Sequence, residues 1–130
     1  MNSAVLPLVG RILIAALFLP AGIGKALAFA GTAGYMAKLG FPAPTVAAAL
    51  AIAIEVGGSI LLIVGWKTRW AAWGLAIFAV VAALTAHRFW EFDVSVAMNQ
   101  RNHFFKDFAL AGGLLLLAAF GPGPASVDKR

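Results

Sequence analysis

One carboxylate is placed where it can do chemistry at membrane depth. Glu55 is the only charged residue in the long apolar run 44–64. About 20 apolar residues cross the hydrocarbon core of a bilayer, so this run is long enough to span it. An ionised acid at that depth costs on the order of 3 kcal/mol unless it is paired, protonated or hydrated. The position of Glu55 therefore favours either a functional site or a hydrogen bond that only holds two helices together.

Further polar side chains lie near the ends of the apolar runs. Arg11 and Lys25 share one stripe of the first run, because fourteen residues are close to four helical turns. They either belong to a site or extend to opposite membrane interfaces. Alternating the direction of successive helices sends one end of the first, third and fourth runs to the same side. The residues predicted to gather there, with Glu55 deeper, are Lys25, His87, Arg88, Asn102, His103, Lys106 and Asp107.

A cluster of cations and imidazoles above a buried carboxylate suits an anionic or quinone-like ligand, or proton exchange with it. Imidazole contributes because it changes charge near neutral pH. Lys106 either extends to the interface or turns inward to pair with Glu55. The alternative for the whole cluster is the solvated rim of a loop. The candidates for ligand binding or proton handling are Glu55, Lys25, His87, Asn102, His103, Lys106 and Arg11, and no catalytic residue is assigned.

The composition identifies an integral membrane protein. Of the 130 residues, 62% are hydrophobic and 12% charged, whereas a soluble domain carries about 25% charged residues. The net charge is +5, but the Lys and Arg residues lie mostly at the ends of apolar runs, which indicates contact with lipid headgroups rather than nucleic acid. The chain has no cysteine for thiol chemistry, and its two histidines do not favour a self-contained zinc or haem site, so no metal is predicted.

Four apolar runs predict an all-α fold, a four-helix bundle in one membrane domain over residues 1–130. Backbone polar groups must be satisfied inside lipid, so the runs are helices rather than strands. Gly31 and Gly34, then Gly40 to Pro44, are expected to punctuate the first connection. We expect the first run to be a retained span rather than a cleaved signal peptide, because Lys25 separates it from the small residues that follow. The predicted spans are 6–29, 44–64, 70–86 and 104–120.

Four crossings place both termini on the same side of the membrane. The turn after the second span carries Lys67 and Arg69, and the opposite loop carries Glu91 and Asp93. This distribution favours cytoplasmic termini, because positive residues concentrate on the cytoplasmic side. A multi-pass protein of the bacterial cytoplasmic (inner) membrane is therefore expected.

The chain resembles the DoxX family of small four-helix bacterial membrane proteins, over nearly its whole length. The resemblance implies the bundle, and relatives include a subunit of a thiosulfate:quinone oxidoreductase and proteins of redox or oxidative-stress complexes. It does not imply a particular reaction. The residues that carry it are, in order, Arg11, Gly22-Ile23-Gly24-Lys25, Leu39-Gly40-Phe41-Pro42, Glu55-Val56-Gly57-Gly58, Gly65, Arg69, His87, Asn102, Lys106, Gly112-Gly113 and Gly121-Pro122-Gly123-Pro124-Ala125-Ser126-Val127-Asp128.

Three functions remain open at this point. The first is a subunit or partner of a membrane redox complex linked to a quinone or a sulfur compound, an oxidoreductase subunit that is not catalytic on its own. The second is a small proton-coupled transporter in which Glu55 gains and loses a proton. The third is a scaffold in which the polar residues only hold helices together. The expected partners are the lipid bilayer, a redox protein or a second copy of the chain.

Overall fold

The computed structural model describes residues 4–129, and within that range all regular secondary structure is helical. Four continuous stretches are long and apolar enough to cross a membrane: Val5–Leu27, Pro44–Val64, Thr68–Glu91 and Val94–Phe120. The all-α fold with four spans is confirmed. The elements are α1 (Val5–Leu27), α2 (Phe29–Lys38), α3 (Pro44–Ile52), the π-helical turn η1 (Ala53–Gly57), α4 (Gly58–Val64), α5 (Thr68–Ala86), the 3-10 turn η2 (Phe89–Glu91) and α6 (Val94–Phe120).

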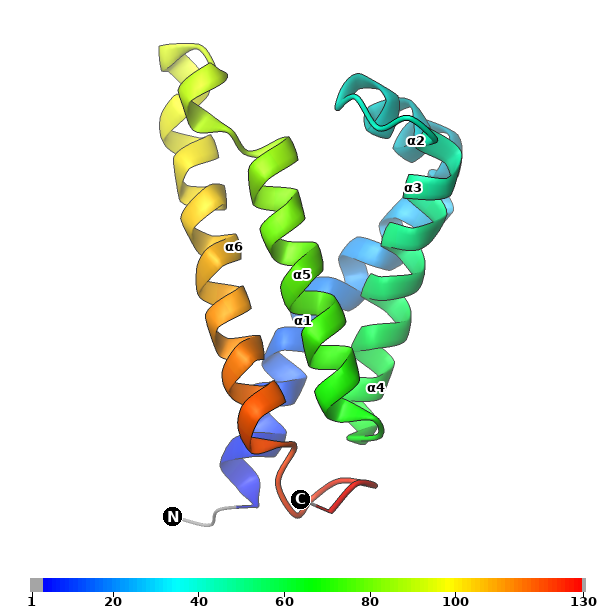
Figure 1. Cartoon of the computed structure of the whole chain (residues 1–130), viewed down its shortest axis with the longest axis vertical. Helices are drawn as coiled ribbons and strands as arrows, with labels where there is room; N and C mark the ends of the chain where they lie inside the picture. The colour runs from blue at the N-terminus through cyan, green and yellow to red at the C-terminus, as the bar shows by residue number, and fades with distance from the viewer. Residues whose placement is uncertain (1–3, 130) are drawn as a thin grey trace.

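The spans pack as an antiparallel bundle (Figure 1). Helix α6 runs alongside α5, while α3, η1 and α4 form one continuous second span that packs against α1. The start of α1 and the end of α6 lie at the end of the bundle that also holds the α4–α5 turn (Figure 1). Helix α2 lies at the opposite end, where the polar candidates were expected.

Two boundaries differ from the sequence prediction. Helix α6 begins at Val94 rather than near residue 104. The prediction missed its first turns because they are polar, and the span was placed from its apolar residues. Gly31 and Gly34 lie within α2, so the prediction that they interrupt the first connection was wrong. A side chain at either glycine would meet nothing within 4 Å, which places both on an open face. The real break is at Gly40, whose φ of 94° suits glycine.

Small residues in the core let the helices approach one another closely. The buried side chains are mainly alanines and a few leucines, including Leu62, Leu75 and Leu114. A Cβ at Gly58 would lie only 3.0 Å from Leu75, so glycine sets the distance between α4 and α5 there. Large apolar residues such as Leu13 (66% exposed) point outward, as expected for surfaces that face lipid.

A polar anchor closes the end of the bundle near the termini. Arg11 is 1% exposed and donates from Nη1 to the carbonyl oxygen of Leu62 at 2.7 Å and from Nη2 to that of Ala125. The Asp128 carboxylate accepts the backbone N–H of Thr68 at 2.9 Å and caps the start of α5. Because Arg11 and Asp128 both hold segment 121–128 against the bundle, this end is tightly connected.

Candidate functional site

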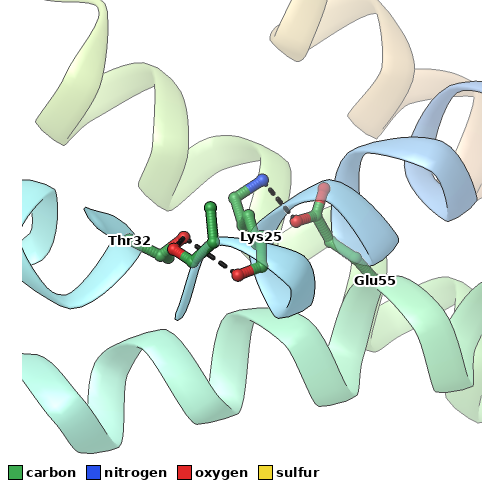
Figure 2. Close-up of polar contacts among 4 residues, drawn as sticks. Lys25, Thr32 and Glu55 are labelled. Carbon is green, nitrogen blue, oxygen red and sulfur yellow. Dashed lines mark hydrogen bonds and ion pairs between the residues drawn. The ribbon is translucent and has the colours of Figure 1, made fainter. Parts of the chain in front are cut away.

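Glu55 and Lys25 form an ion pair inside the bundle (Figure 2). Lys25 Nζ donates to Glu55 Oε1 at 2.6 Å. The Glu55 side chain is 3% exposed, and that of Lys25 is 29% exposed. Glu55 therefore faces the interior with a polar partner, and the partner is Lys25 rather than Arg11 or Lys106.

The backbone around Glu55 is unusual, because the residue lies in the π-helical turn η1 between α3 and α4. A π-turn inserts one extra residue into a helix, changes the direction of the local side chains and recurs at functional sites. No other π-turn is present in residues 4–129. The turn therefore sets which way the Glu55 carboxylate points relative to the rest of the second span.

Helix α1 approaches this π-turn very closely through Gly22. A Cβ at Gly22 would lie 2.9 Å from Glu55 Cβ and 2.8 Å from Val56 Cγ2, so only glycine fits without a shift. Lys25 follows three residues later, on the neighbouring part of the same face. Its carbonyl oxygen lies 3.1 Å from the Thr32 hydroxyl, which ties the end of α1 to α2 (Figure 2).

A cavity of about 300 Å³ lies against the ion pair. Its walls combine an aromatic and aliphatic surface with a polar end. Phe18 and Phe78 meet edge to face with 6.2 Å between ring centroids, and Lys25 Nζ lies 6.0 Å from the centre of the Phe78 ring. The lining residues are Leu17, Phe18, Ala21, Lys25, Tyr35, Met36, Leu39, Phe41, Glu55, Phe78, Ala79, Val81, Ala82, Thr85, Ala86, His87, His103, Lys106 and Asp107.

The two histidines form a stacked pair at the polar end of this cavity. The His87 and His103 rings lie 4.9 Å apart and 19° from parallel. His87 Nδ1 lies 2.7 Å from Gln100 Oε1, a contact in which Nδ1–H donates to the amide oxygen when the neutral ring carries its proton on Nδ1. His87 Nε2 lies 3.9 Å from Asp107 Oδ2. His87, His103 and Asp107 line the same cavity as the Lys25–Glu55 pair.

The structure brings together five of the seven candidates from the sequence. Glu55, Lys25, His87, His103 and Lys106 all line the cavity. Asn102 is exposed and is not among the lining residues. Arg11 lies at the opposite end of the bundle, where it holds backbone carbonyls.

Several cavity residues were absent from the sequence candidates. Asp107 was expected near the cluster but was not selected, although it follows His103 by one helical turn and lines the cavity. Gln100 does not line the cavity but contacts His87 Nδ1, and no sequence pattern indicates this contact because it depends on where α6 begins. Tyr35 and Phe78 look like ordinary apolar or interfacial residues until α2 and α5 are placed around the same cavity.

The lining suits an amphipathic organic ligand. Lys25 can donate to a carbonyl or an oxyanion, and Glu55 can accept from a hydroxyl. The carboxylate oxygen Asp107 Oδ2 is buried and has no hydrogen-bond partner among the described residues. Phe18 and Phe78, whose rings meet edge to face, contribute to the apolar part of the lining. Within residues 4–129 no group of three or more His, Cys, Asp or Glu side chains is arranged to hold a metal ion.

Comparisons with known proteins place this chain within a family. The sequence model of the DoxX family matches residues 6–88, which include Lys25, Glu55 and His87. The chain is 36% identical over 126 residues to inner membrane protein YphA of Escherichia coli strain K12, covering 97% of this chain and 90% of the relative. It is 38% identical over 122 residues to inner membrane protein YqjF of the same organism, covering 94% and 88% respectively. No solved structure gives a significant match.

Proposed function

This chain belongs to the DoxX family of integral membrane proteins, and from that membership we propose that it is the ligand-binding membrane subunit or partner of a redox complex. The ligand is a quinone or an anionic sulfur compound. The names of the two relatives give an inner-membrane location. We propose the same membrane here, with the termini in the cytoplasm because Lys67 and Arg69 lie at that end.

The observation that carries this proposal is the buried Lys25–Glu55 pair at the wall of the cavity. A buried ion pair is a weak source of stability, because desolvation offsets much of its attraction. Glu55 also lies near the middle of the second span, where ionisable residues usually serve a function. The value of the pair therefore lies in binding a polar group or in handling protons.

The polar end of the cavity fits the proton chemistry of a quinone. Reduction of a quinone to a quinol takes up two electrons and two protons. In this proposal the electrons come from the redox partner, since the chain has no cysteine to supply them through a thiol. Lys25 orients a ligand oxygen, Glu55 accepts a proton from the His87–Asp107 end of the cavity and passes it to the quinone, and the same route supplies the second proton.

Copurified quinone tests the proposal. Wild type, Lys25→Met and Arg101→Met would be extracted gently from membranes, and bound quinone would be quantified by mass spectrometry. Arg101 is a matched control, because it is an exposed cation on α6 that does not line the cavity. We expect quinone with wild type and Arg101→Met, and a loss of about tenfold with Lys25→Met. Equal quinone in all three samples, or none in wild type, would contradict the proposal.

Proton-coupled transport is the second candidate, and the geometry around Glu55 is the specific reason. The carboxylate lies at mid-span, and the cavity links it to the histidine end of the bundle. A transporter would carry a solute across liposome membranes in response to a pH gradient, and Glu55→Gln would abolish that flux. A redox subunit would show no such flux, and a scaffold would show neither flux nor quinone binding.

A further inference from the structure

The cavity reaches the outer surface of the bundle at the level of the bilayer core. Four of its lining residues are exposed. Tyr35 of α2 (47%) and Lys106 of α6 belong to the polar end, and the other two are Leu17 of α1 (40%) and Val81 of α5 (41%). Each of these other two lies near the middle of its span, Val5–Leu27 or Thr68–Glu91. An exposed side chain at that depth contacts lipid rather than water.

We propose that the ligand enters this cavity sideways from the lipid, between the exposed edges marked by Leu17 and Val81. The ligand is therefore lipid-soluble, with a polar head and an apolar tail, and is not a water-soluble sulfur anion. This inference rests on the proposed function, because it takes the cavity to be the ligand site.

The packing of the helices explains why the cavity is open between Leu17 and Val81. Helix α2 packs against α3 and α1, whereas α5 packs mainly against α6 and α4. Tyr35 and Met36 of α2 and Phe78 of α5 therefore line the cavity from two helices that do not pack closely against each other. The lining residues that flank Leu17 and Val81 on α1 and α5, namely Phe18, Ala21 and Ala82, are apolar, so a hydrophobic ligand entering beside them meets no charged side chain there.

The polar end of the bundle carries charged side chains, unlike the opening at Leu17 and Val81. A second hollow there is bordered by Lys38, Arg88 and Glu91, and Arg88 Nη2 pairs with Glu91 Oε1 at 3.3 Å. It shares Tyr35, Leu39, Thr85 and Ala86 with the cavity, so those side chains separate the two spaces. This charged end suits the passage of water and protons rather than of an apolar ligand.

The size of the cavity also favours a ligand that remains partly in the bilayer. Small-molecule sites range over about 300–1,000 Å³, and this one, about 300 Å³, is at the lower limit. A single ring with its oxygen substituents fits such a space, whereas a long tail does not. A tailed molecule that enters sideways can place its head at Lys25 and leave its tail in the lipid.

Photoaffinity labelling in lipid nanodiscs tests this route. The probes are an azidobenzoquinone with a decyl tail and the same ring without the tail, and labelling rates at cavity peptides are measured by mass spectrometry. The blocking variant carries Leu17→Trp and Val81→Trp. Its matched control carries Leu13→Trp and Leu84→Trp, which are exposed neighbours on the same helices that do not line the cavity.

We expect the tailed probe to label wild type and the control at similar rates, and the blocking variant about tenfold more slowly. We also expect the ring without a tail to label wild type weakly. Equal labelling of the blocking variant and the control, or equal labelling by both probes, would overturn lateral access while leaving the ligand site in place. If neither probe labels the cavity of wild type, the proposed function fails and lateral access fails with it.

Discussion

Lys25 Nζ and Glu55 Oε1 lie 2.6 Å apart in the interior of the bundle, and their ion pair links the first span to the π-helical turn of the second. The two residues differ in their access to water. Glu55 is 3% exposed, whereas Lys25 at 29% lies at the end of α1 and can reach the polar end of the cavity. Removing Lys25 and removing Glu55 should therefore change the stability of the protein by different amounts.

Lys25→Met should destabilise the protein more than Glu55→Gln. The first change leaves a buried carboxylate without its partner, a situation that costs about 3–5 kcal/mol in the interior of soluble proteins. The second leaves a lysine that can turn toward water. Thermal unfolding in detergent measures both, and a double variant completes the cycle. Equal losses, or strictly additive effects in the double variant, would show that the pair is not coupled.

Gly22→Val should lower the unfolding temperature and Gly24→Val should change it much less. A Cβ at Gly22 meets Val56 and Glu55 at less than 3.0 Å, whereas a Cβ at Gly24 meets nothing within 4 Å. Overpacking of this kind costs about 1–3 kcal/mol. Both variants place valine in the same helix, so any effect of a β-branched side chain on helix stability is common to the two. Similar melting of the two would contradict the close approach of α1 to η1.

The His87 ring should be protonated on Nδ1 in its neutral form. Free histidine prefers the other tautomer, but the bond to Gln100 Oε1 requires a donor at Nδ1. The chain has two histidines, so selective ¹⁵N labelling gives two ring systems to assign. Gln100→Leu should return His87 to the Nε2–H form and leave His103 unchanged. An Nε2–H tautomer in the wild-type protein would contradict a hydrogen bond donated by Nδ1 to Gln100 Oε1.

Asp128 should stabilise the protein at neutral pH but not in acid. The backbone N–H of Thr68, and then that of Lys67, donates to the carboxylate and holds the pKa of Asp128 below its usual value. A lowered pKa in the folded state gives stability that is complete above the unfolded pKa, about 3.9, and is lost as the pH falls through the lower folded value. Asp128→Ala should therefore melt below wild type at pH 7, with a smaller difference near pH 3.

Asp93→Ala is the matched control for that experiment. Asp93 also precedes a helix, but its side chain makes no capping hydrogen bond to α6. Its substitution should leave the unfolding temperature nearly unchanged at both pH values. A difference between wild type and Asp128→Ala that stays constant from pH 7 to pH 3 would show that the effect does not depend on the charge.

The four spans could be predicted from the sequence, because the length of an apolar run can be compared directly with the thickness of the hydrocarbon core. The sequence also predicted a convergence of Lys25, His87, His103 and Lys106 near Glu55, since alternating helices fix which ends meet. It could not select Lys25 as the partner, because that choice depends on the π-turn and on the contact at Gly22. Asn102 was misplaced for a related reason, since the rotation of α6 decides which of its polar residues faces inward.

Quinone-reductase activity and melting temperature of Glu55→Gln, measured together, test the central claim most directly. Gln retains the shape and hydrogen-bonding capacity of Glu but cannot ionise. If Glu55 handles protons for a bound quinone, membranes carrying Glu55→Gln should lose about tenfold or more of their activity while the purified protein melts close to wild type. Normal activity, or a loss of activity that only follows a lowered melting temperature, would contradict the account.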